Sequence, residues 1–203
     1  MDTNAFRTKL YQGNEDLMIL IGDEDMEEVH QKVPCTILTI DGFDWDDALT
    51  PWPAESVFKG RMFTGHADEL TAYVESLPIL KKQWRNKWIG GYSLAGLFSL
   101  YFCTKTDLFD GCISCSGSLW YDGFMKYLET YPVHCPHVYL SLGDREKHTK
   151  NQRMRTVEDC HRKAEGIISS YCDCTFELNE GNHFRDPGGR MTKGIQWMME
   201  RCK

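Results

Sequence analysis

The stretch WIGGYSLAGLFSL, residues 88–100, sets an apolar run and two glycines before Ser93 and a helix-like run directly after it. Short apolar runs closed by glycine are typical of buried strands, and the Leu, Ala and Phe residues that follow favour a helix. Residues 91–96 match the pattern G-x-S-x-G, except that Ala95 stands at the final glycine. In that pattern the serine sits at a strained strand-to-helix turn, where its near neighbours must be very small. The stretch therefore predicts an exposed nucleophile at Ser93.

The rest of the chain alternates between strand-like and helix-like segments. Short runs of β-branched and long aliphatic residues predict strands at 17–22, 35–42, 87–93, 111–118, 137–144 and 174–181. Longer patterns predict helices at 67–82, where Pro78 is expected to kink or end the helix, and at 94–105, 122–131, 151–171 and 187–202. This alternation of apolar strands and helices predicts an α/β fold with a mostly parallel sheet and helices on both faces.

Size and charge restrict the classes of function. The chain has 203 residues and a formal net charge of −7. We expect one domain over residues 1–203, because this length allows a good core but not an additional sizeable cap. An acidic surface argues against nucleic acid as a partner, since phosphate binding needs clustered Lys and Arg. No run approaches the roughly 18 apolar residues of a membrane span and no apolar signal segment is visible, so we expect no membrane association and a cytoplasmic location.

Cysteine usage favours reduced core thiols over disulfides or a metal site. The nine cysteines are odd in number, in a chain without an export signal. CISC at 112–115, CDC at 172–174 and HCPH at 134–137 lack a further ligand pair at zinc spacing. The acidic run DGFDWDD, 41–47, lacks the glycine and distal glutamate of an EF-hand loop. We therefore expect no cofactor and no metal.

A serine hydroxyl needs a base and an orienting acid, and chains with this turn carry them in the order Ser, acid, His. Of the seven histidines, His183 alone follows a late predicted strand. Asp144 and Glu146 both stand at the end of the strand predicted at 137–144, and both are candidates for the acid. Because the carboxyl ends of parallel strands share one edge of the sheet, we expect these groups to meet Ser93 there.

The negative charge that develops on a reacting carbonyl needs two backbone donors. The N–H after the nucleophile belongs to Leu94. The second donor is expected in TIDGFDWDD, residues 39–47, where Gly42 permits a tight turn. Phe43 is the first candidate in this loop, with Asp44 as the alternative.

Five longer segments resemble one group of small bacterial α/β-hydrolases, the esterases related to esterase D and enterochelin esterase. The segments are DGFDWDDALTPWPA, GGYSLAGLFSLYF, SGSLWYDGF, LSLGDREKHTKN and FELNEGNHFRDPGGRMTKGIQWM. The resemblance runs from about residue 11 to the end. It implies a minimal α/β-hydrolase without a cap domain, with Ser93 as nucleophile and His183 as base. Together with the local turn chemistry, it favours Glu146 over Asp144 as the acid.

The reaction implied by the resemblance is hydrolysis of a carboxylic ester, on a small or siderophore-like substrate. Acyl transfer to another acceptor, thioester cleavage, and ligand binding without catalysis on the same scaffold are the alternatives. The chain is shorter than typical relatives and lacks their early strands, which leaves the substrate open. Trp45 and Trp120 are candidates for the walls of a substrate pocket, although such aromatics can equally plug the open end of a short sheet.

Overall fold

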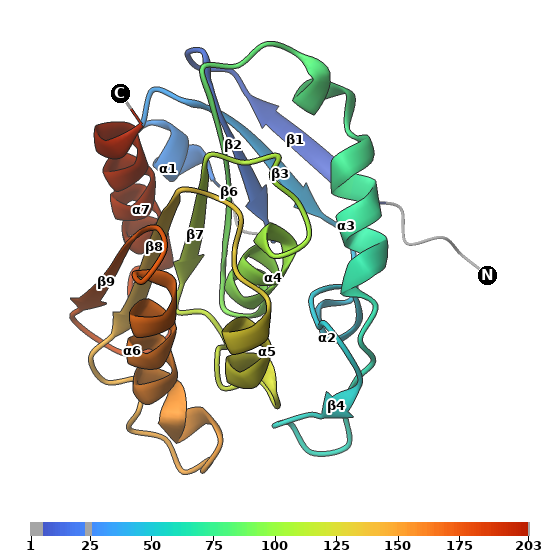
Figure 1. Cartoon of the computed structure of the whole chain (residues 1–203), viewed down its shortest axis with the longest axis vertical. Coiled ribbons are helices and arrows are strands. Elements are labelled where there is room, and N and C mark those ends of the chain that lie inside the picture. The colour runs from blue at the N-terminus through green and yellow to red at the C-terminus, as the bar shows by residue number, and fades with distance from the viewer. Residues whose placement is uncertain (1–5, 23–25, 203) are drawn as a thin grey trace.

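Residues 6–22 and 26–202, which the computed structural model describes, form a mostly parallel sheet of seven strands in the order β1-β3-β2-β6-β7-β8-β9 (Figure 1). The strands are β1 (Arg7–Tyr11), β2 (Asp16–Ile21), β3 (Thr36–Asp41), β6 (Asn86–Tyr92), β7 (Gly111–Cys115), β8 (His137–Gly143) and β9 (Asp173–Asn179). β1 runs antiparallel to β3, and the other neighbouring pairs in this sheet are parallel. The predicted α/β class is confirmed.

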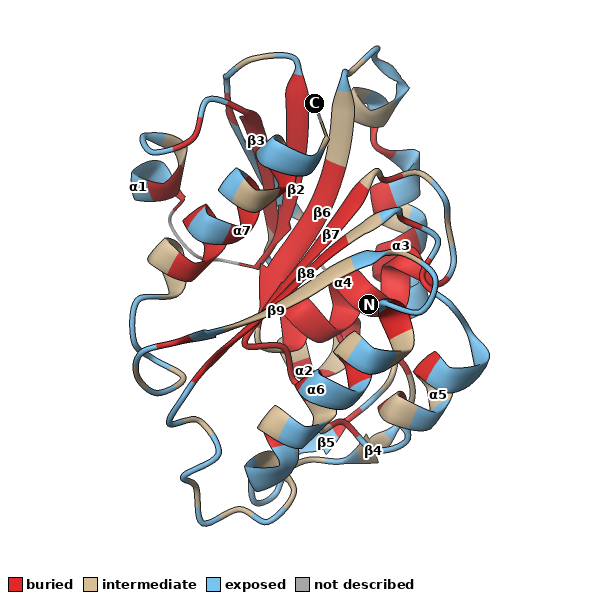
Figure 2. Cartoon of the chain, turned by 60° about the vertical axis from the view of Figure 1, so that its left-hand side comes forward, coloured by how far each residue is buried: buried red, intermediate tan, exposed pale blue. Residues whose placement is uncertain are grey.

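Helices cover both faces of the sheet, and a separate apolar core holds each layer. On one face lie α1 (Glu27–His30) and α7 (Pro187–Arg201). On the other lie α3 (Ala67–Ser76), α4 (Leu94–Cys103), α5 (Phe124–Thr130) and α6 (Val157–Ile168). Figure 2 shows the central strands buried between these layers. Strands covered on both faces are expected to be mainly apolar, as in β2, where all six residues are buried and the five after Asp16 are apolar.

The connection between β3 and α3 runs along the carboxyl edge of the sheet. It contains α2 (Trp45–Ala48) and a two-stranded sheet of β4 (Ala54–Glu55) and β5 (Met62–Phe63). Short 3₁₀ turns occupy Pro78–Lys81, in the connection between α3 and β6, and Met154–Thr156, directly before α6. In the described part of the chain no separate cap domain covers this edge, in agreement with the expected minimal architecture.

Three differences from the sequence-based expectation have simple physical causes. β1 was not predicted, because it is an edge strand whose first four residues are exposed and show no apolar run. The short helices α1 and α2 and the β4–β5 pair were also missed, since two or four residues carry no measurable periodicity. The helix predicted at 67–82 ends at Ser76, two residues before Pro78, as the missing proline N–H requires.

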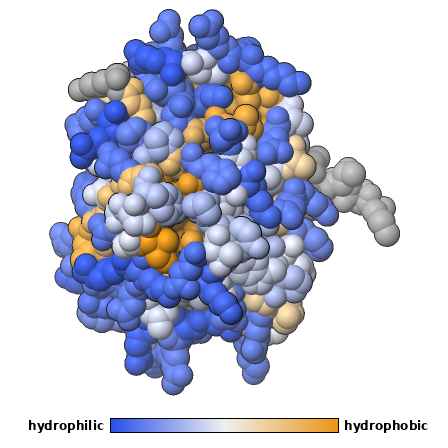
Figure 3. Space-filling model, in the orientation of Figure 1, coloured by the Kyte–Doolittle hydropathy of each residue, from blue (hydrophilic) through white to orange (hydrophobic). Residues whose placement is uncertain are grey.

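Figure 3 shows that the face seen in Figure 1 is mostly hydrophilic, with apolar side chains gathered in separate areas. Within residues 6–22 and 26–202, none of the helices has the length and apolar composition to cross a membrane.

The turn between β6 and α4 has the strained backbone that its sequence predicts. Ser93 has φ 59° and ψ −121°, a backbone conformation that residues other than glycine rarely adopt. Its N–H donates to the carbonyl of Cys115 on β7 at 3.0 Å, which ties the turn to the sheet. A Cβ atom added to Gly91 would lie 2.5 Å from the Cβ of Ala95. Small residues at 91 and 95 therefore let α4 start close to the end of β6.

We expect Gly91→Ala to lower the free energy of unfolding by roughly 1–3 kcal/mol, because the new methyl group overlaps the first turn of α4. Urea denaturation at pH 7 measures this change. Gly166→Ala is the matched control, since a Cβ there meets nothing within 4 Å. That variant should gain about 0.5–1 kcal/mol from helix propensity. Equal stability of the two variants would contradict the steric explanation.

Candidate active site

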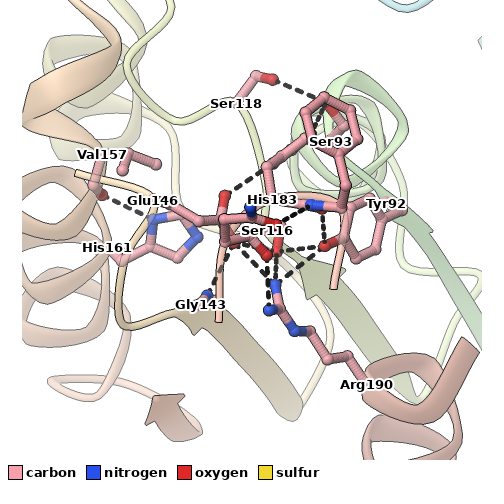
Figure 4. A network of polar contacts seen from close by, with 12 residues as sticks. Tyr92, Ser93, Ser116, Ser118, Gly143, Glu146, Val157, His161, His183 and Arg190 are labelled. Atoms are coloured by element: carbon pink, nitrogen blue, oxygen red, sulfur yellow. Dashed lines mark hydrogen bonds and ion pairs between the residues drawn. The ribbon is translucent and has the colours of Figure 1, made fainter. Parts of the chain in front are cut away.

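Three side chains from three strand ends meet at the carboxyl edge of the sheet (Figure 4). Ser93 follows β6, Glu146 follows β8, and His183 lies between β9 and α7. His183 Nε2 lies 3.1 Å from Ser93 Oγ, and His183 Nδ1 lies 2.7 Å from Glu146 Oε2. Both distances are those of hydrogen bonds, so a continuous chain of contacts joins the hydroxyl to the carboxylate. The structure thus brings together the three side chains that the sequence selected.

The Glu146 carboxylate is ionised although only 4% of its side chain is exposed. Burial by itself raises the pKa of Glu146, but hydrogen bonds from His183, Ser116 and the Gly143 N–H favour the charged form and lower the pKa to about 2. Oε1 accepts from the Gly143 N–H at 2.7 Å and from the Ser116 hydroxyl at 2.6 Å. Oε2 is left for His183, so the two carboxylate oxygens have separate tasks.

Sequence reasoning missed the polar residues that lie beneath this site, namely Tyr92, Ser116 and Arg190. Arg190 comes from α7, is 2% exposed and contacts Glu146 Oε1 at 2.8 Å. A signal was present in the sequence, since Arg190 shares one helix face with Gly194 and Met198 at a spacing of four residues. Both of those residues are buried. An arginine on the apolar face of an amphipathic helix indicates a buried polar partner.

Asp144, the alternative acid, has a different contact. Its Oδ1 accepts a hydrogen bond from the Gly181 N–H at 2.8 Å, and its own N–H donates to the carbonyl of Asn179. Asp144 therefore ties the loop after β8 to the loop after β9, two residues before His183. This is the local backbone role expected for whichever acidic residue does not contact the histidine.

The two predicted backbone donors have no hydrogen-bond partner within the described residues. Leu94 is the first residue of α4, so its N–H has no acceptor inside the helix. Phe43 lies between β3 and α2, and its ring is buried against Phe6 with ring centroids 6.0 Å apart. Asp44 caps α2 by accepting the Asp46 N–H at 2.9 Å. The role of Leu94 and Phe43 as donors to an oxyanion stays a prediction.

The sequence matches no family model, and a search of curated proteins finds no significant relative. Solved structures are nevertheless similar over nearly the whole chain. The siderophore hydrolase EstB from Aspergillus nidulans is 16% identical, with a TM-score of 0.66 over 97% of this chain and 89% of that chain. The enterobactin esterase FES from Shigella flexneri is 15% identical, with a TM-score of 0.70 over 98% of this chain and 56% of that chain.

A plant enzyme of nearly the same length gives a similar match. Acyl-protein thioesterase 2 from Zea mays is 13% identical, with a TM-score of 0.61 over 97% of this chain and 99% of that chain. This chain has the α/β-hydrolase fold. The expected architecture is thereby confirmed, and at these identities the likeness concerns the fold alone.

A cavity of about 550 Å³ is lined by Ser93 and His183. Its walls are mainly apolar and include Trp45, Phe58, Phe63, Leu94, Trp120, Met154, Val157 and Phe184. Both tryptophans that the sequence proposed as pocket walls thus line the cavity. Its polar wall contains an ion pair between Arg61 and Asp46 at 2.6 Å. Phe184 is 84% exposed, directly after His183.

None of the nine cysteines lines the cavity. All nine cysteines are free, and five of them are buried, including Cys112 and Cys115 on β7. Among the described residues no group of three or more His, Cys, Asp or Glu side chains is arranged to hold a metal ion.

A second histidine lies close to the site but is fully buried. His161 on α6 contacts the carbonyl of Val157 through Nδ1 at 2.8 Å (Figure 4). Its ring packs against Phe176. Burial lowers the pKa of His161 to about 4, because a charged imidazole would lose its hydration there. Nε2 of this ring has no partner among the described groups. His161 is thus a neutral residue of the core.

His161 should make the α/β-hydrolase fold sensitive to acid. The pKa of His161 is lower in the folded protein than in the unfolded chain. The free energy of unfolding is therefore highest above about pH 6.5 and falls by roughly 3 kcal/mol in total as the pH drops toward 4. We expect His161→Phe to reduce this loss, measured by urea denaturation between pH 7 and 4. His134→Asn, at an exposed position, should follow the wild type. A His161→Phe curve parallel to that of the wild type would refute this explanation.

Proposed function

We propose that this protein is a serine hydrolase that cleaves carboxylic esters, with Ser93 as nucleophile, His183 as general base and Glu146 as the orienting acid. The observation that carries the proposal is the chain of contacts from Ser93 Oγ through both ring nitrogens of His183 to Glu146 Oε2. A carboxylate on Nδ1 holds the proton there and leaves Nε2 free to accept the proton of the serine.

The proposed reaction has two halves. Ser93 Oγ attacks the ester carbonyl while its proton passes to His183 Nε2, and the resulting oxyanion is held by the N–H groups of Leu94 and Phe43. His183 then gives this proton to the leaving alkoxide, which breaks the ester bond and leaves an acyl-serine. Water, deprotonated by His183, attacks the acyl-serine, and Ser93 regains its proton when the acid is released.

The substrate is proposed from the cavity and from what similar structures are named for. EstB and FES are named as a siderophore hydrolase and an enterobactin esterase, which supports a small or siderophore-like ester. The aromatic walls, with Trp45 and Trp120 among them, suit an apolar acyl or aryl group larger than acetyl. The Zea mays structure is named for thioesters, so thioester cleavage is the second candidate.

We expect Ser93→Ala and His183→Ala to lose on the order of a millionfold in turnover of p-nitrophenyl esters, because each removes a group that acts with the other as a unit. Labelling with a fluorophosphonate probe should stop in Ser93→Ala. Ser99→Ala, on the same helix and with its hydroxyl bonded to the Ala95 carbonyl, should keep the wild-type rate. Labelling of wild-type protein at Ser93 excludes a scaffold that only binds a ligand. Full turnover by Ser93→Ala would reject the proposed function.

Acyl length should distinguish the substrates. We expect hexanoyl and benzoyl esters to have a higher kcat/KM than acetyl esters, since each buried CH₂ group contributes about 0.8 kcal/mol. Trp120→Ala should lower kcat/KM for the larger esters roughly tenfold and change it little for acetyl. Trp84→Ala is the control, because Trp84 packs outside this cavity. The matching hexanoyl thioester, assayed in parallel, tests the second candidate; a preference for acetyl esters would contradict the assignment of the walls.

A further inference from the structure

Arg190 is the centre of the polar network beneath the site, and every other member of that network comes from a different strand end. Its Nη1 lies 2.8 Å from Glu146 Oε1, 2.8 Å from Ser116 Oγ and 2.9 Å from Tyr92 Oη. Ser116 follows β7 and Tyr92 ends β6, directly before Ser93. One guanidinium on α7 thus contacts the proposed acid and the two strand ends on which the nucleophile depends (Figure 4).

The same side chain also holds the loop that carries the proposed base. Arg190 Nη2 donates to the carbonyl of Asn182 at 2.9 Å. Tyr92 Oη donates to the carbonyl of His183 at 2.6 Å, and itself accepts from Arg190 Nη1. The carbonyls of two successive residues are therefore fixed, one directly and one through Tyr92. Since His183 lies in the loop between β9 and α7, outside any helix or strand, these contacts fix the position of its main chain.

A glycine at position 143 leaves space for the Arg190 guanidinium. A Cβ atom on Gly143 would lie 2.7 Å from Arg190 Nη2 and 2.4 Å from the carbonyl oxygen of Gly181. A glycine at this point therefore lets the guanidinium lie between the loops after β8 and β9. The ionisable side chains that touch it are Glu146 and Tyr92, and His183 lies beyond Glu146.

A buried arginine is a poor choice if α7 needs only stability. Removing a guanidinium from water is costly even when it is paired, and a well-packed apolar side chain at such a position is often neutral or more stable. The neighbours of Arg190 on the same helix face, Gly194 and Met198, are buried and uncharged. An arginine suits a position where several acceptors must be held at fixed distances from one another, because its planar donors can bind them in one rigid arrangement.

We infer that Arg190 is a positioning residue: it binds the Glu146 carboxylate with one nitrogen and the carbonyl of Asn182, directly before His183, with the other, and so sets the distance between acid and base. The inference rests on the proposed function of Ser93, His183 and Glu146. Arg190 does not touch the reacting atoms and acts through these groups.

The test compares Arg190→Met, Arg190→Lys and Tyr92→Phe with two matched controls. Arg201→Met makes the same change on the same helix at an exposed ion pair with Asp173. Tyr139→Phe removes a buried, hydrogen-bonded hydroxyl that is bonded instead to Glu177. The readouts are kcat and KM for a p-nitrophenyl ester from pH 5 to 9, the rate of fluorophosphonate labelling, and the fraction of active sites titrated.

In Arg190→Met we expect kcat to fall roughly 100-fold with KM nearly unchanged, because a displaced base costs this much in rate. The acid limb of its pH–rate profile should move to higher pH, because the charge near the imidazole is gone. Arg190→Lys restores the charge but not the planar fork, so the limb should return while kcat stays low. Tyr92→Phe should lower kcat roughly tenfold without moving the limb. Both controls should match the wild type.

Two results would overturn the inference while leaving the proposed function intact. In the first, the probe labels the wild type, and both Arg190→Met and Tyr92→Phe keep the kcat and the pH profile of the wild type. The second is a loss of activity equal to the loss of titrated sites, which means that the arginine only supports folding. If Arg190→Met does not fold, Tyr92→Phe decides, since the phenyl ring keeps its packing. A wild type that neither labels nor turns over esters rejects the proposed function itself, and the inference with it.

Discussion

The close approach of β6 and α4 at Ser93 is the constraint on which the site depends. The backbone can take φ 59° at Ser93 only if its neighbours leave room, and Gly91 and Ala95 are small enough to do so. The parallel strands then bring the loops after β7, β8 and β9 to the same edge. Strain at one residue is thus offset by the packing of a sheet that is buried on both faces.

Much of this arrangement could be predicted from the sequence because it follows local rules. The motif around Ser93, the strand before it and the helix after it are all continuous in the chain. Glu146 and His183 were candidates because each follows a strand, and strand ends of one direction share an edge. The preference for Glu146 over Asp144 came from the family resemblance together with the local turn chemistry. The structure brings these side chains within hydrogen-bond distance. Their chemical roles remain the proposal made above.

What the sequence did not reveal depends on contacts between distant segments. Arg190 is 44 residues from Glu146 and 98 from Tyr92 along the chain, so no local pattern pairs them. β1 carries no apolar run because its outer edge faces solvent. The hairpin of β4 and β5, which brings Phe58, Arg61 and Phe63 to the cavity, is too short for any periodicity. The walls of the cavity were therefore harder to predict than the groups at its floor.

The nine free cysteines affect how the unfolded chain behaves under oxidising conditions. Packing raises the pKa of Cys35 and of Cys172 to about 12, chiefly through burial, so the folded chain presents almost no reactive thiolate there. Unfolding exposes all nine thiols together, and an odd number cannot pair completely. In an oxidising solution the unfolded chain would be trapped by scrambled disulfides and would not refold. The folded state therefore protects these thiols from oxidation.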